Sequence, residues 1–105
     1  PSLEIAKILM KKGYRVRVFD PHVEPSLLQG LGFETASNFE EVFTGVDVVI
    51  IATDHPEFKK LDFHNIKKLS GKDKMAVVDA RNLIEYKNLP PNMIYVGIGK
   101  PWIET

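Results

Sequence analysis

The chain has 105 residues, 44% of them hydrophobic and 27% charged, with 14 basic and 14 acidic side chains. This length suffices for one core and is too short for two domains of ordinary size. The balanced charge argues against a nucleic-acid-binding surface, and the absence of cysteine excludes disulfides and a cysteine nucleophile within these residues. No signal peptide or membrane-spanning run is recognised, so we expect a cytoplasmic protein without a membrane partner.

The first third of the chain alternates helix-like and strand-like patterns. Apolar residues at helical spacing precede Gly13, which is placed to end a helix. Valines that alternate with arginines then predict a strand with one wetter face, ending at Asp20. The elements predicted here are a helix over 2–12, a strand over 14–19, a short helix from Pro25 and an extended piece over 33–35.

The remainder of the chain continues the alternation. Asn38 followed by Glu41 has the form of a capping box for a short helix that ends at Gly45. The almost continuously apolar run 46–52 predicts a central strand covered by helices on both faces. The next predicted elements are a helix from Asp62 to Gly71, a strand over 75–79 and a last strand over 93–96.

Alternating helices and strands predict an α/β fold, a Rossmann-like three-layer αβα sandwich with a parallel sheet. The chain nevertheless opens on a helix, whereas a doubly wound sheet opens on a strand that lies at the centre of the sheet. We therefore expect residues 1–105 to form one domain, truncated at its N-terminal side and lacking its first strand. The strands over 14–19 and 46–52 would then flank an unfilled position.

The segment Asp79-Ala80-Arg81-Asn82 follows the apolar run 75–78. It places a carboxylate and a guanidinium at the carboxyl end of a buried strand, where open α/β sheets bind ligands. The planar fork of arginine suits phosphate or a planar base, so Arg81 is the principal candidate for ligand binding. The residues alone equally allow an ion pair between Asp79 and Arg81 that closes the edge of the sheet.

Other strand ends carry acids and histidines. Asp20 occupies the place of the acid that binds the ribose of a dinucleotide, but no Gly-x-Gly-x-x-Gly loop accompanies it. We interpret Asp20 and Pro21 as a turn. His22 and His55 lack the helical spacing typical of a metal pair, and Asp54 is more simply the start of a helix.

Four segments carry a more specific signal: Pro1-Ser2-Leu3-Glu4-Ile5, Val18-Phe19-Asp20-Pro21-His22, Val48-Val49-Ile50-Ile51-Ala52-Thr53-Asp54-His55 with Phe58, and Val77-Val78-Asp79-Ala80-Arg81-Asn82. In this order and spacing they resemble the C-terminal, UDP-binding domain of UDP-glucose/GDP-mannose dehydrogenases. The resemblance covers nearly the whole chain. The Thr-Asp-His form at 53–55 is more similar to the UDP-N-acetylhexosamine branch, and UDP-N-acetylmannosamine dehydrogenases in particular, than to UDP-glucose dehydrogenases, which tend to have Thr-Glu-Trp.

The resemblance implies a three-part, homo-oligomeric enzyme. An N-terminal domain holds NAD, a central helical segment dimerises, and a domain like this one closes over the UDP of the sugar nucleotide. Enzymes of this family oxidise the C6 alcohol of the sugar to a carboxylate in two hydride transfers, through a covalent cysteine adduct. Their catalytic cysteine and lysine and their cofactor glycines would all lie before Pro1, so the isolated chain is expected to be inactive.

The resemblance also assigns a role to Arg81, which matches the arginine of an Asp-x-Arg motif that contacts the nucleotide of the substrate. The expected substrate-binding residues are Arg81, Asp79 and Asn82, with Asp54 and His55 as further candidates; none is expected to be catalytic, to bind a cofactor or to bind a metal. Three alternatives remain open at this point. They are a UDP-glucose 6-dehydrogenase domain, a free-standing nucleotide-binding module, and a receiver-type signalling domain, which requires a lysine where this chain has Arg81.

Overall fold

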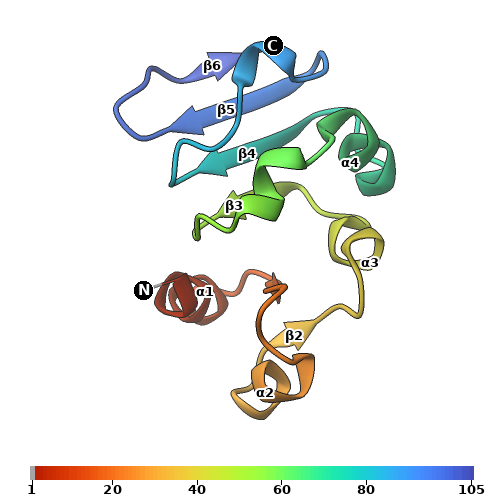
Figure 1. Cartoon of the computed structure of the whole chain (residues 1–105), viewed down its shortest axis with the longest axis vertical. Helices are drawn as coiled ribbons and strands as arrows, with labels where there is room; N and C mark the ends of the chain where they lie inside the picture. Colours follow the sequence, from red (N-terminus) through yellow and green to blue (C-terminus); the bar gives the residue numbers. More distant parts are fainter. Residues whose placement is uncertain (1) are drawn as a thin grey trace. The chain divides into compact units, whose positions relative to one another are not determined.

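The computed structural model describes residues 2–105, which divide into two units that meet in sequence after Val42. Each unit contains its own sheet. The first sheet has the order β1-β2 and the second the order β3-β4-β5-β6 (Figure 1). None of the described helices is long and apolar enough to cross a membrane.

The first unit is built from short elements around a small core. Ala6, Leu28 and Phe33 are buried together in this core. β1 and β2 pair in parallel, as a doubly wound order predicts, but β1 covers only two residues of the strand predicted over 14–19. The elements are α1 Ser2–Lys11, β1 Arg17–Val18, α2 Pro25–Gly30, β2 Glu34–Thr35 and α3 Phe39–Phe43, whose last residue belongs to the second unit.

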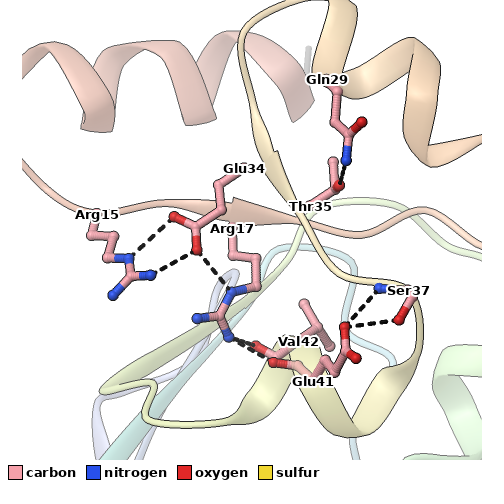
Figure 2. A network of polar contacts seen from close by, with 8 residues as sticks. All are labelled: Arg15, Arg17, Gln29, Glu34, Thr35, Ser37, Glu41 and Val42. Carbon is pink, nitrogen blue, oxygen red and sulfur yellow. Dashed lines mark hydrogen bonds and ion pairs between the residues drawn. The ribbon is translucent and has the colours of Figure 1, made fainter.

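Arg15, just before β1, and Arg17 of β1 make the polar contacts of this strand pair (Figure 2). Arg15 donates to both carboxylate oxygens of Glu34, at 2.9 and 3.1 Å, and Arg17 donates to one of them at 3.5 Å. Arg17 also donates to the backbone carbonyls of Glu41 and Val42, at 2.7 and 3.0 Å. Because carbonyls at a helix end lack intrahelical partners, Arg17 links the strand pair to the end of α3.

The predicted capping box at the start of α3 is confirmed, with one difference. The Asn38 side-chain oxygen accepts from the backbone N–H of Glu41 at 2.9 Å. The Glu41 carboxylate reaches one residue further back than expected, where it accepts from the N–H and the hydroxyl of Ser37 at 3.1 and 2.8 Å (Figure 2). Both hydrogen bonds lower the pKa of Glu41.

Asp20 forms the turn that its sequence context indicates. Its side chain accepts from the backbone N–H of His22 at 2.8 Å, and its carbonyl accepts from the N–H of Val23 at 3.3 Å. Side-chain to backbone bonds of this kind are typical of Asx turns. The carboxylate thus stabilises the chain reversal after β1.

The second unit carries the larger sheet, in which β3, β4 and β5 run parallel. The prediction that the strand over 93–96 is the last one is wrong, because β6 follows and pairs antiparallel with β5 (Figure 1). The hydroxyl of Thr105 donates to Pro90 and accepts from the N–H of Met93, which fixes the end of the chain. The elements are β3 Val48–Ile51, a 3-10 helix Pro56–Lys60, α4 Phe63–Ser70, β4 Met75–Asp79, a 3-10 helix Tyr86–Asn88, β5 Met93–Gly97 and β6 Ile103–Glu104.

The predicted signals at both ends of α4 are confirmed. The Asp62 carboxylate accepts from the N–H groups of His64 and Asn65 at 3.0 and 3.4 Å. Gly71 follows the helix in the left-handed conformation, with a φ of 69°, which glycine adopts without steric cost. Phe63 and Ile66 are buried, so the capped helix turns an apolar face to the core.

The prediction that the apolar strand over 46–52 is central and covered on both faces is wrong for the part of the chain that the structure describes. β3 lies at one edge of its sheet, with β4 on its other side. Its side chains alternate between faces, and Val48 and Ile50 are 48% and 39% exposed while Ile51 is buried. The continuous apolar run therefore corresponds to a strand with one exposed face. Among residues 2–105, no other strand pairs with its outer edge.

This edge generates a prediction. The carbonyls of Asp47 and Ile51 bond to β4, so by alternation the N–H and C=O of Val48 and Ile50 point to the other edge. Exposed, uncharged edges pair with other strands. We predict that the 105-residue polypeptide self-associates through this edge and that Ile50→Pro shifts it toward monomer in sedimentation experiments.

The matched control is Val49→Pro, which removes a donor on the β4 side and should lower the melting temperature more than Ile50→Pro does. A stable monomer at all concentrations, unchanged by Ile50→Pro, would contradict the prediction of an open strand position.

Candidate functional site

Three loops meet at the carboxyl end of the parallel strands. Asp79, the last residue of β4, pairs in register with Ile51 of β3 and with Gly97 of β5. Because parallel strands end at the same edge, the segments that follow all three strands lie there together. The loop after β4 contains Arg81, and the one after β3 contains Asp54.

The carboxylate of Asp79 anchors the loop after β4. It is 0% exposed, because the alternation of the strand sends it to the buried face with Val77. One oxygen accepts from the N–H groups of Arg81 and Leu83, at 3.3 and 3.0 Å. The other accepts from the N–H of Ile84 at 2.8 Å and from a side-chain hydroxyl described below. A single buried carboxylate therefore holds three backbone amides of one short loop.

The second donor to that oxygen is the hydroxyl of Tyr95, at 2.9 Å. Tyr95 is itself fully buried and pairs in register with Val77, two residues before Asp79 on β4. Burial raises the pKa of Asp79, but the amides of Ile84, Leu83 and Arg81 and the Tyr95 hydroxyl together lower it below its ordinary value. Burial and the adjacent carboxylate raise the pKa of Tyr95, so both groups keep the protonation states that the hydrogen bond requires.

The guanidinium of Arg81 lies at the surface, where it pairs with Asp54. The distance from Nη2 to the Asp54 carboxylate is 3.2 Å, and the two side chains are 48% and 69% exposed. Among the described residues, this is the only ion pair of Arg81. The predicted alternative, an ion pair between the Arg81 and Asp79 side chains, is wrong, because Asp79 binds the Arg81 backbone instead.

Asn82 shapes the loop through its backbone. It has a φ of 54°, in the left-handed region that asparagine tolerates better than most residues. Its side-chain amide donates to the carbonyl of Ile98 at 3.5 Å, which links the loops after β4 and β5. The neighbouring candidate His55 is half-buried and packs edge-on against Phe58, with ring centroids 5.4 Å apart.

The structure thus brings together four of the five residues predicted for the site. Asp54 and Arg81 face solvent, Asp79 lies beneath their loop, and Asn82 connects to the next loop. Asp54 does not cap the following 3-10 helix as expected, since that helix begins after His55 and its cap makes no side-chain hydrogen bond. The ring of His55 packs against Phe58 of that helix.

Sequence reasoning missed Tyr95. A tyrosine in the middle of an apolar strand needs a partner for its hydroxyl, and an acid at the end of the neighbouring strand supplies one. The signal was present, but using it requires the pairing of β4 with β5, which single-strand patterns do not give.

The arrangement suits anion binding. An exposed guanidinium on a loop fixed from beneath offers several N–H donors in one plane, the geometry that phosphates and carboxylates accept. No group of three or more His, Asp or Glu residues that could hold a metal ion lies within residues 2–105.

The chain is similar in sequence to proteins of a known family. Residues 1–86 match the family described as the UDP binding domain of the UDP-glucose/GDP-mannose dehydrogenase family. A UDP-N-acetyl-D-mannosamine dehydrogenase of Pyrococcus horikoshii is 36% identical over 95% of this chain and 21% of its own length. A UDP-glucose 6-dehydrogenase of Bacillus subtilis is 30% identical over 96% of this chain and 22% of its own.

A solved structure is similar as well. The crystal structure of NDP-N-acetyl-D-galactosaminuronic acid dehydrogenase from Methanosarcina mazei Go1 covers 95% of this chain and 20% of that chain, with 26% identity and a TM-score of 0.69. The predicted Rossmann-like α/β fold is thereby confirmed.

The family match over residues 1–86 makes this α/β domain a part of the nucleotide-sugar dehydrogenases. In particular, the chain is a member of the UDP-binding domain of the UDP-glucose/GDP-mannose dehydrogenase family. It spans about a fifth of the length of the curated relatives that it matches.

The anchoring role of Asp79 predicts a pH dependence of stability. A carboxyl whose pKa is lower in the folded state stabilises the fold above its unfolded pKa of about 4, and that contribution is lost as the pH falls through the lower folded value. Asp79→Asn should lower the free energy of unfolding at pH 7 by about 1–3 kcal/mol, which appears as a lower melting temperature. The decrease should be smaller at pH 3. Thermal melts of both proteins across this range test it. A difference that does not shrink in acid would contradict the anchoring role of the charge.

Proposed function

We propose that this chain is the UDP-binding part of an NAD-dependent UDP-N-acetylhexosamine 6-dehydrogenase, with UDP-N-acetylmannosamine as the preferred substrate. Arg81 contacts the nucleotide, Asp79 holds the loop that presents it, and Asn82 and Asp54 border the contact. His55 remains a further candidate through the loop after β3. The full enzyme oxidises the sugar C6 alcohol to a carboxylate and acts as a homo-oligomer in the cytoplasm.

One observation carries this proposal. The Arg81 guanidinium is exposed at the ligand-binding edge of an α/β sheet, and its partner Asp54 is more exposed still. Exposed ion pairs contribute little free energy, so a phosphate or a uracil carbonyl can take the place of Asp54 at small cost. The family to which the chain belongs is named for the binding of UDP.

The described residues do not fit NAD. Asp20, the acid that follows β1, accepts a hydrogen bond from the backbone N–H of His22 in its own turn. The sequence Gly97-Ile98-Gly99 begins at the last residue of β5 and leads to β6, whereas a dinucleotide loop lies between a strand and a helix. We therefore place the cofactor on another domain of the proposed enzyme, and no step of its chemistry is assigned to this chain.

UDP-glucose is the alternative substrate. The Bacillus subtilis relative is called a UDP-glucose 6-dehydrogenase, and it matches the chain over nearly the same extent as the mannosamine enzyme. Relative turnover of the two sugar nucleotides by the complete enzyme distinguishes these candidates. The family assignment replaces the receiver-type alternative.

Substitutions of Arg81 test the contact with the nucleotide. Arg81→Lys keeps the charge and loses the planar fork, whereas Arg81→Ala loses both. Affinity for UDP, measured by calorimetric titration, should fall in that order. Loss of a charged hydrogen bond is worth about 1.5–3 kcal/mol, or roughly tenfold to a hundredfold in the dissociation constant.

Arg15→Ala is the matched control, because Arg15 is also exposed and also paired with a carboxylate, in the other unit. It should leave UDP affinity unchanged. Equal affinities of the wild-type and Arg81→Ala proteins would overturn the assignment of Arg81 to the nucleotide.

A second prediction concerns activity. The sequence contains no cysteine for a covalent adduct, and the described residues offer no dinucleotide loop. The 105-residue polypeptide should therefore form no NADH from NAD with either UDP-N-acetylmannosamine or UDP-glucose, followed by absorbance. Measurable turnover of the purified polypeptide would contradict its role as a binding domain.

A further inference from the structure

The Asp79 carboxylate has one side-chain donor among the residues described, the hydroxyl of Tyr95. The other three donors are backbone amides of the loop that carries Arg81. The two sets approach the carboxylate from different elements, one from β5 and the other from the loop after β4. The hydroxyl therefore constrains where the carboxylate lies, and the carboxylate constrains the loop.

The end of β5 is shaped to accommodate this hydroxyl. A Cβ atom on Gly97 would lie 2.8 Å from the Tyr95 hydroxyl oxygen and 2.9 Å from a carbon of its ring. Both distances are shorter than real Cβ contacts allow, and the buried ring has no room to move away. Glycine at this position is thus required by the place that the tyrosine occupies.

Lysine 100 completes the surroundings of the hydroxyl. The ammonium of Lys100 donates to the Tyr95 hydroxyl at 3.4 Å and lies 5.5 Å from the ring centres of both Tyr95 and Tyr86. The turn after β5 thus contacts the Tyr95–Asp79 pair, and the carbonyl of Ile98 in the same turn contacts Asn82.

We propose that Tyr95 is a positioning residue for nucleotide binding. Its hydroxyl orients Asp79, Asp79 orders the loop from Arg81 to Ile84, and the ordered loop presents the Arg81 guanidinium to the UDP moiety. This inference rests on the function proposed above, and it adds a buried residue of β5 that touches no ligand itself. The effect of Tyr95 on affinity must then pass through Arg81.

Tyr95→Phe keeps the ring and removes only the hydroxyl. Hydrogen–deuterium exchange measured by mass spectrometry, in the absence of nucleotide, should be about tenfold faster in peptides that cover residues 80–85, the size of effect expected for one hydrogen bond to a charged group. UDP affinity, measured by titration, should fall. Tyr86→Phe is the matched control, because Tyr86 packs against the Tyr95 ring but makes no hydrogen bond to Asp79 among the described residues, and it should change neither quantity.

A double-mutant cycle separates positioning from general destabilisation. In an Arg81→Ala background, Tyr95→Phe should lower UDP affinity no further. A further drop of the same size as in the wild-type background would overturn the inference, as would unchanged exchange of residues 80–85. Where Tyr95→Phe melts too low to be measured, Lys100→Met, which removes the second contact of the hydroxyl, should give smaller changes of the same kind, and their absence counts against the inference. If the wild-type protein binds no UDP, the proposed function itself fails, and this inference fails with it.

Discussion

A buried carboxylate needs hydrogen-bond donors in place of water, and the donors to Asp79 set the geometry of the loop that carries Arg81. Its removal from water is unfavourable unless donors surround it, and three of its four donors are amides of the loop that follows β4. The loop cannot change shape without leaving part of the charge unpaired. The need to keep the buried charge paired therefore keeps the loop ordered, and the position of Arg81 depends on a residue that is inaccessible to solvent.

The candidate site consists of two buried groups and two exposed groups with different roles. Asp79 and Tyr95 are fully buried and set the geometry, whereas Arg81 and Asp54 are exposed and are free to exchange partners. Hydrogen bonds to a buried charge are among the stronger ones in proteins, but surface ion pairs are weak and are screened by salt. In our proposal, this rigid support beneath a weakly held guanidinium allows a ligand to replace Asp54 rapidly without loss of orientation.

Local sequence signals predicted much of the secondary structure, but they did not predict which strands pair with each other. Asp62 and Gly71 mark the ends of α4, because capping depends only on residues within one turn of the helix end. The apolar pattern predicts β4 correctly, because it too depends only on neighbouring residues. The edge position of β3, the antiparallel β6 and the contact of Tyr95 with Asp79 depend on which strands are neighbours. That information lies in long-range packing, and the alternation along a single strand does not contain it.

The names of the relatives bear on which part of the substrate this domain contacts. The relatives that match this chain are named for different sugars, yet they share the domain at comparable identity. Such a pattern is expected if the domain meets the part that these substrates have in common, the UDP, because contacts with a shared moiety cannot separate its carriers. In our proposal, Arg81 and its support then contribute uniform binding energy for every UDP-sugar. Discrimination between hexoses must depend on groups that reach the sugar ring.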